Sequence, residues 1–166
     1  MVVAGIDAST KKSGVCIMID GELIFYTLID LEKEKDAIKR IPKMMIKICE
    51  VLDKYDIDTI CMEKSILKTN VDTVQKLSNL AGAIMLYCAQ KGIKFEHPTP
   101  PMWRKVVGLQ QSSKIKRDVL KAEAILAVEQ EYGLHVGDDV AEAVLLARSM
   151  FNLPKIDMTE DDLWGE

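Results

Sequence analysis

The sequence contains no apolar run long enough to cross a bilayer, so it predicts no membrane-spanning segment. Its first residues hold no basic segment followed by an apolar stretch, and we therefore expect no secretory signal and a cytoplasmic location. Internal repeats and low-complexity segments are also lacking. The 166 residues, 48% of them hydrophobic, are expected to form one globular domain with a single core.

Cysteine is scarce, and its spacing excludes the usual cysteine-based sites. Cys16, Cys49, Cys61 and Cys88 form no Cys-x-x-Cys pair, and each lies in an apolar run. This pattern is typical of reduced thiols in the core of a cytosolic protein, rather than of disulfides or zinc ligands.

The chain has fewer basic than acidic residues overall, but one segment is strongly basic. The formal net charge is −4, and residues 154–166 account for all of it, with five acidic residues against one lysine. Residues 1–153 are therefore formally neutral, and within them residues 101–121 carry six basic residues against one aspartate. Such a local patch can bind phosphate groups whatever the total charge. A solvated helix face gives the same pattern, so both interpretations stay open.

The hydrophobic pattern predicts an α/β fold. Three strands joined by short turns come first, and helices then alternate with strands. The predicted strands cover residues 2–7, 14–19, 22–29, 57–63 and 93–97, and the main helices cover 36–55, 71–91, 112–132 and 138–151. The order β-β-β-α-β-α-β-α-α predicts a mixed five-stranded sheet with helices packed on it. We expect a domain over residues 1–153 and a disordered acidic tail over 154–166.

The predicted helix ends rest on capping and breaking residues. Pro42 should kink the first helix or mark its true start. Ser112 or Ser113 can cap the helix that ends at Tyr132, and Asp138 can cap the last helix.

Four acidic residues stand where otherwise apolar segments end. Asp7 closes the first predicted strand, Glu63 closes the fourth, and Asp139 and Glu142 share one face of the last helix. A carboxylate is costly to bury unless it is paired or binds a metal, and oxygen-rich sites suit Mg²⁺ or Mn²⁺. Each acid taken alone has an ordinary explanation, as a turn residue, a salt-bridge partner or a helix-dipole partner. Together they predict a metal site suited to phosphodiester hydrolysis.

The acidic segments resemble a known family. Gly5-Ile6-Asp7, Met62-Glu63 and Asp139-x-x-Glu142-Ala143 are similar, in this order, to the acidic motifs of the RuvC Holliday junction resolvases, which belong to the RNase H-like superfamily. The similarity includes the stretch after Glu63 and Val106-Val107-Gly108 with Lys114, and it covers residues 1–150. The length and acidic spacing are most similar to the bacteriophage branch, which would place the chain in the host-cell cytoplasm.

The resemblance implies a metal-dependent, structure-specific endonuclease that cleaves Holliday junctions and other branched DNA. It implies an RNase H-like fold with helices on both faces of the sheet, two Mg²⁺ ions per site with Mn²⁺ as an alternative, and a homodimer. Asp7 would bridge both ions, Glu63, Asp139 and Glu142 would complete the site, and Lys114 would steady the scissile phosphate. The predicted DNA contacts are Lys11, Lys12, Lys64, Lys68, Trp103, Arg104, Lys105, Lys114, Lys116 and Arg117. We expect the dimer interface on helix 71–91.

Three positions depart from the family pattern. Ala8-Ser9 follows the first acid where Pro-Gly is usual, Glu142 stands where Asp is common, and Ile66 replaces an aromatic residue that often stacks on bases. Because Ile cannot stack as an aromatic ring does, we expect relaxed sequence recognition and cleavage of several branched DNAs, forks and flaps among them.

Other functions fit parts of the sequence. Residues 5–10, Gly-Ile-Asp-Ala-Ser-Thr, resemble the first phosphate loop of actin-like ATPases and sugar kinases, but that fold needs a second domain and a second loop. A module that binds branched DNA without cutting it is the main alternative. Two roles also stay open: His135 could orient a metal ligand or be a loop residue, and Trp103 could stack on DNA or anchor the core.

Overall fold

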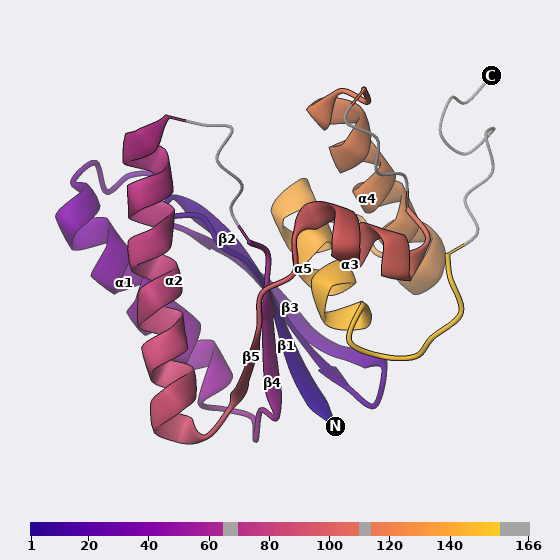
Figure 1. Ribbon diagram of the computed structural model, residues 1–166, viewed down its shortest axis with the longest axis horizontal. Helices are drawn as coiled ribbons and strands as arrows, with labels where there is room; N and C mark the ends of the chain where they lie inside the picture. Colours follow the sequence, from indigo (N-terminus) through magenta and orange to yellow (C-terminus); the bar gives the residue numbers. More distant parts are fainter. Residues whose placement is uncertain (65–69, 110–113, 157–166) are drawn as a thin grey trace.

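A computed structural model describes residues 1–64, 70–109 and 114–156 of the chain. It contains five strands and five helices within these residues (Figure 1). They are β1 (Val2–Asp7), β2 (Lys12–Ile19), β3 (Glu22–Asp30), α1 (Ala37–Leu52), β4 (Thr59–Met62), α2 (Val71–Lys91), β5 (Lys94–Glu96), α3 (Pro100–Val107), α4 (Arg117–Tyr132) and α5 (Asp138–Arg148). The predicted α/β class and the order of the main elements are confirmed.

The strands form one mixed sheet in the order β3-β2-β1-β4-β5. The first three strands make an antiparallel meander, while β4 pairs parallel to β1 and β5 pairs parallel to β4. A parallel neighbour needs a crossover, and α1 and α2 supply the two crossovers. Because β1 and β4 run in the same direction side by side, the residues that follow them emerge at the same edge of the sheet.

Helices cover both faces of the sheet, as the resemblance implied. In Figure 1, α1 and α2 lie on one side, and α3, α4 and α5 lie on the other. The expectation of a single core is wrong, because the sheet separates two hydrophobic cores: Ile48, Leu52 and Ile84 belong to the first, and Val128 and Val144 belong to the second. The sheet is therefore buried on both faces over its central strands, as the continuous apolar pattern of β1 indicated.

Two glycines let α5 lie directly on the sheet. A Cβ atom on Gly5 would stand 2.0 Å from the Ala143 carbonyl oxygen, and one on Gly14 would stand 1.9 Å from the Asp139 carbonyl oxygen. No side chain larger than hydrogen fits such approaches without moving the helix. The start of α5 is thereby held against β1 and β2, beside the end of β1.

Several element ends differ from the sequence predictions. The N-cap of α5 is Gly137, so Asp138 is the first helical residue instead of the cap. Lys116 is the N-cap of α4, and the predicted caps Ser112 and Ser113 lie outside the described residues. Pro42 does not mark the start of α1, because it lies inside that helix.

The chain after α5 stays on the domain for several residues. The Ile156 side chain is buried in the α5-side core, and its amide donates to the Val107 carbonyl over 2.9 Å. The Pro154 carbonyl accepts from Arg148. The packed chain therefore extends to residue 156, three residues past the predicted boundary, and the rest of the predicted tail lies outside the described residues.

The structure can also be compared with the predictions for the cysteines and for membrane-spanning segments. All four cysteines are free, and Cys16, Cys61 and Cys88 are buried. Among the helices of the described part of the chain, none has the length and apolar character of a membrane span.

Candidate active site

The register of the parallel pair brings two of the four acids together. Ile6 stands opposite Met62 in the β1–β4 ladder, so Asp7 and Glu63 follow as the next pair at the same sheet edge. Side chains alternate along a strand, and Gly5 faces α5. Asp7, two residues further along, therefore also faces α5.

The other two acids lie on the first turns of α5. Because Asp139 and Glu142 are three residues apart, they share one helix face. The contact between Gly14 and the Asp139 backbone holds this helix start next to Asp7. All four side chains are partly buried, and the electrostatic field at Asp7 comes from Glu142, Glu63 and Asp139. The structure thus gathers the four predicted acids into one cluster, which we call the carboxylate cluster.

Burial raises the pKa of every member of the carboxylate cluster, and repulsion from other members adds to the effect at Asp7 and Glu142. Loss of solvent contact is the largest cause in each case. For Asp7 the pKa lies well above its ordinary value, and a hydrogen bond with Glu142 adds to the effect. For Glu142 the pKa rises to about 7, with Glu63 as the next cause. Near neutral pH the cluster therefore holds protons that ordinary carboxyls would have lost.

The donor set of the carboxylate cluster fits hard divalent cations. Its ligands are carboxyl oxygens, which Mg²⁺ and Mn²⁺ prefer, and a cation would relieve the repulsion that raises the pKa values. Among the residues that the structure describes, no three Asp, Glu, His or Cys side chains already stand in ligand geometry for one ion. The backbone thus brings the donors together, and the side chains would turn to bind the ion.

Trp103 contacts the cluster from α3. Its indole Nε1 donates to Glu63 Oε2 over 2.7 Å, and the side chain is 1% exposed. The prediction that Trp103 contacts DNA is therefore wrong, since a ring this deeply buried offers no face to a base. Of the two roles left open by the sequence, the core anchor is the one observed.

Arg104 is also inside the protein. It is 3% exposed, forms an ion pair with Glu123 of α4, and donates to the Leu120 carbonyl over 3.1 Å. The predicted DNA contact by Arg104 is wrong for this reason. Its charge nevertheless reaches the cluster, where it lowers the pKa of Glu63 and Glu142 against the stronger effect of burial.

Sequence reasoning missed a lysine beside the cluster. Lys121 of α4 forms an ion pair with Asp138, and its charge acts on Asp139 and Glu142. Lys121 belongs to the basic stretch 101–121, which was noticed in the sequence. Its position beside the cluster could not be predicted, because its partner Asp138 lies on another helix. Arg117, a predicted DNA contact, is exposed on the same helix and acts electrostatically on Glu63 and Asp139.

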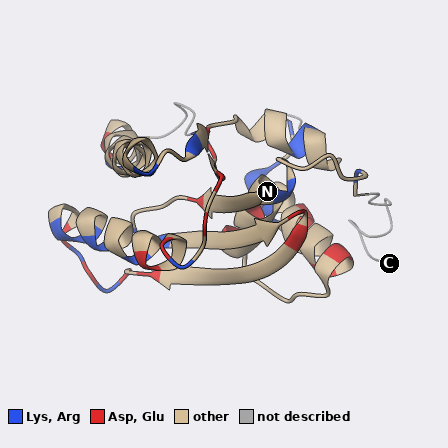
Figure 2. Cartoon of the chain, turned by 90° about the horizontal axis from the view of Figure 1, so that it is seen from below, with Lys and Arg blue, Asp and Glu red and all other residues tan. Residues whose placement is uncertain are grey.

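The remaining predicted basic contacts differ in their exposure. Lys11, Lys64, Lys105, Lys114 and Lys116 are exposed. Lys12 forms ion pairs with Asp30 and Glu32 at 3.6 and 3.2 Å. Lys68 lies outside the described residues. Figure 2 shows Lys and Arg on α1 and on the helices of the α3–α5 side. Positive charge reaches the cluster from Arg104, Arg117 and Lys121, which lower the pKa of its members.

His135 does not join the cluster. Its side chain is exposed and stands 3.1 Å from Glu129. It is therefore the loop residue that was one of the two sequence-based interpretations.

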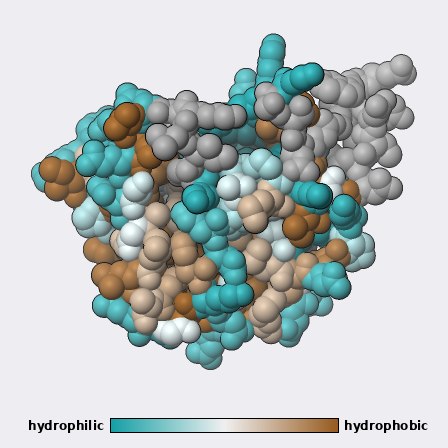
Figure 3. Space-filling view, in the orientation of Figure 1, coloured by the Kyte–Doolittle hydropathy of each residue, from teal (hydrophilic) through white to brown (hydrophobic). Residues whose placement is uncertain are grey.

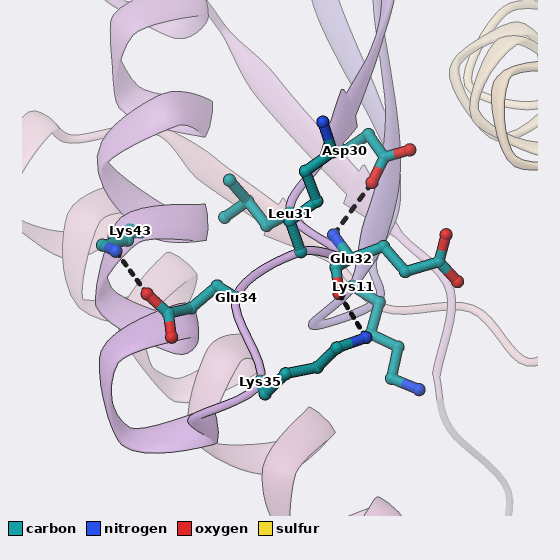
Figure 4. Close-up of a pocket in the computed structure, with 8 residues that line it drawn as sticks. Lys11, Asp30, Leu31, Glu32, Glu34, Lys35 and Lys43 are labelled. Atoms are coloured by element: carbon teal, nitrogen blue, oxygen red, sulfur yellow. Dashed lines mark hydrogen bonds and ion pairs between the residues drawn. The ribbon is translucent and has the colours of Figure 1, made fainter.

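A hollow lies between the loop after β3 and the start of α1 (Figure 4), and no member of the carboxylate cluster lines it. Four lysines line it, but Lys43 is paired with Glu34 and Lys35 donates to the Glu32 carbonyl. The hollow has acidic and basic residues in nearly equal number, so it offers no consistent charge to a ligand.

Comparisons with known proteins place the whole domain in a family. A family model described as crossover junction endodeoxyribonuclease RuvC matches residues 3–147. The crossover junction endodeoxyribonuclease RuvC of Pseudothermotoga lettingae is 25% identical over 152 residues, which are 89% of this chain and 91% of that protein.

Solved structures share the fold. The structure of T. thermophilus RuvC in complex with a Holliday junction substrate has a TM-score of 0.72 at 18% identity, covering 90% of this chain and 92% of that one. The Fowlpox virus resolvase in complex with substrate Holliday junction DNA has a TM-score of 0.61 at 15% identity, covering 90% and 96%. Because the family model spans most of the chain and the fold agrees, the protein belongs to the RuvC family of crossover junction endodeoxyribonucleases.

Proposed function

We propose that this protein resolves four-way DNA junctions by hydrolysing phosphodiester bonds at the carboxylate cluster. The observation that carries the proposal is the meeting of Asp7, Glu63, Asp139 and Glu142 at one sheet edge, with raised pKa values and basic residues nearby. The name of the matching family and the junction DNA in two structures of the same fold support the choice of substrate. Incision would leave 5′-phosphate and 3′-hydroxyl ends.

The four carboxylates would hold divalent cations, with Asp7 shared between two of them. We propose Mg²⁺ as the ion, with Mn²⁺ as a substitute. When bound, the ions supply a hydroxide nucleophile at neutral pH and stabilise charge on the leaving oxygen. The chain's own part is to keep Asp7 at the end of β1, Glu63 directly after β4, and the other two acids on a helix that Gly5 and Gly14 hold against the sheet.

Exposed lysines and one arginine would hold the DNA backbone. Lys114 and Arg117 flank the start of α4, and Lys105 lies on α3 beside the buried Trp103. Contacts of this kind position DNA without reading its sequence, and they weaken as salt rises. We therefore propose relaxed sequence specificity and action on several branched DNAs. The position of Ile66, on which the same expectation rested, lies outside the described residues.

Helix α2 is our candidate for the dimer interface. Val71, Met85 and Leu86 are 74%, 50% and 61% exposed, although they are hydrophobic. Val71 and Met85 form one stripe with exposed Gln75, Ser78, Gly82 and Ala89, at alternating steps of four and three residues, which is the repeat of paired helices; Leu86 lies beside this stripe.

The low charge of α2 supports the proposal of such an interface. Seen nearly end-on in Figure 2, α2 carries little charge, and pale and brown side chains gather over it in Figure 3. Sedimentation of the chain tests this part of the proposal. A species of twice the 18.6 kDa chain mass is expected, and a monomer at micromolar concentration would contradict it.

Strand incision of a synthetic four-way junction tests the proposed function. With Mg²⁺ we expect cuts at the branch point of the junction, no cuts in a linear duplex with the sequence of one arm, and no reaction in EDTA. If the protein binds the junction but never cuts it with Mg²⁺ or Mn²⁺, the chain is a non-catalytic junction-binding module. The cytoplasmic location and the bacteriophage origin expected from the sequence stay predictions.

A further inference from the structure

Glu63 is the member of the carboxylate cluster with the most supporting contacts from a single neighbouring segment. Trp103 donates its indole N–H to Glu63 Oε2 over 2.7 Å. The next amide, that of Lys64, donates to the Pro98 carbonyl over 2.8 Å. Residues 98–103 therefore hold the side chain of this acid and the backbone directly after it.

The chemistry of the Trp103 contact leaves Glu63 able to bind an ion. An indole nitrogen can only donate one hydrogen bond, whereas an ionised carboxylate has two acceptor oxygens. The bond occupies Oε2 and leaves Oε1 without a contact to Trp103. A charge-assisted bond of this kind restricts the rotation of the carboxylate, because turning it would leave a buried donor unpaired.

Contacts of two other α3 residues, Arg104 and Val107, hold the helix that carries Trp103. The Arg104 guanidinium lies 5.2 Å from the centre of the Trp103 ring and is fixed by its ion pair with Glu123. At the other end of α3, the Val107 carbonyl accepts from the Ile156 amide. A donor anchored in this way has little freedom to follow Glu63 if the carboxylate moves.

We propose that Trp103 is a positioning residue for the metal-binding carboxylate of Glu63, fixing one oxygen so that the other is presented to the cation. This inference rests on the proposed metal-dependent function, and it assigns to α3 a role inside the site instead of on the DNA. In metal sites generally, partners that hydrogen-bond a ligand are worth about 10–100-fold in metal affinity or activity.

The test compares Trp103→Phe with Trp164→Phe, the same substitution at the only other tryptophan of the chain. Phenylalanine keeps the apolar ring in the core and removes the donor. Calorimetric titration with Mn²⁺, in the absence of DNA, should show affinity lower by about 10–100-fold in Trp103→Phe and unchanged in Trp164→Phe. Urea denaturation of each variant establishes that it is folded before the titration.

A second measurement reports the hydrogen bond itself. The two indole N–H resonances are assigned in ¹⁵N-labelled protein with the Trp164→Phe variant. Glu63→Gln should shift the Trp103 resonance, because the bond to a charged acceptor is lost, and should leave that of Trp164 in place. A structural role for Trp103 alone would give the shift without the change in Mn²⁺ affinity.

The outcomes separate this inference from the proposed function. If the wild type binds Mn²⁺ and Trp103→Phe binds it equally well, the positioning role is overturned while the metal site stands. A Trp103 resonance that does not respond to Glu63→Gln also overturns it. If the folded wild type binds no Mn²⁺, the proposed metal site fails, and the positioning role fails with it.

Discussion

Replacing Asp7 with asparagine is expected to lower junction incision by about 1000-fold, which corresponds to roughly 4 kcal/mol of transition-state stabilisation. Asp7 is the member of the carboxylate cluster on which all three of the others act. An amide of the same shape keeps the packing and loses the charge that a divalent cation needs. Initial incision rates of the wild type and of Asp7→Asn, with Mg²⁺ and the same four-way junction, give the comparison.

Two controls make the Asp7→Asn result specific. Asp56→Asn removes a charge from an exposed residue just before β4, at the opposite end of that strand, and should cut like the wild type. Junction binding by Asp7→Asn should stay close to the wild-type value, because the lost group holds metal instead of DNA. Incision by Asp7→Asn at the wild-type rate would contradict the assignment of Asp7.

The second large effect is a gain in stability: removing the charge of Glu142 is expected to stabilise the metal-free protein at high pH. In the metal-free protein, Glu142 has a pKa of about 7 in the folded state against an ordinary value of 4.5. Between these pH values the folded state holds a proton that the unfolded chain has released, so the free energy of unfolding falls as pH rises. The contribution of Glu142 is fully present below pH 4.5 and is lost above pH 7, with a size of about 3 kcal/mol.

Glu142→Gln should remove this part of the pH dependence. In EDTA we expect the variant to unfold at higher urea concentration than the wild type at pH 8, and the difference between them should shrink toward pH 4.5. Glu50→Gln, at an exposed residue paired with Lys47, is the matched control and should follow the wild-type curve. If Glu142→Gln is less stable than the wild type at pH 8, the carboxylate cluster is not under mutual repulsion.

Both effects come from the same arrangement. The carboxylates that are proposed to bind a cation also destabilise the metal-free protein. The residues needed for activity are therefore expected to lower its free energy of unfolding when no metal is present. Inactivation of Asp7→Asn therefore cannot be assigned to misfolding if the variant is as stable as the wild type.

The parts of the fold that could be predicted from sequence rest on local patterns. The apolar run that ends at Asp7, the turn at Asp20-Gly21 and the three-residue step from Asp139 to Glu142 each specify a strand, a hairpin or a helix face. Their meeting at one edge followed from the element order and the family resemblance. Gly5 and Gly14 allow α5 to approach the sheet closely enough for the acids to meet. Their role could not be predicted from sequence, because it depends on the backbone of a distant helix.

What could not be predicted depends on contacts between distant segments. Trp103, Arg104 and Lys105 read as a basic surface in the sequence, yet only Lys105 is exposed. Arg104 is buried because Glu123, on another helix, stands opposite it. Asp138 has the chemistry of an N-cap, but it forms an ion pair with Lys121 and Gly137 takes the cap position. In each case the partner lies sixteen or more positions away, beyond the reach of spacing rules.

The central claim is that Asp7, Glu63, Asp139 and Glu142 form one metal site. Calorimetric titration of Mn²⁺ into the wild type and into the four single amide variants tests it most directly. We predict that the folded wild type binds Mn²⁺ and that each amide variant binds it at least tenfold more weakly, about 1.4 kcal/mol or more. Equal affinity in the wild type and all four variants would contradict the claim.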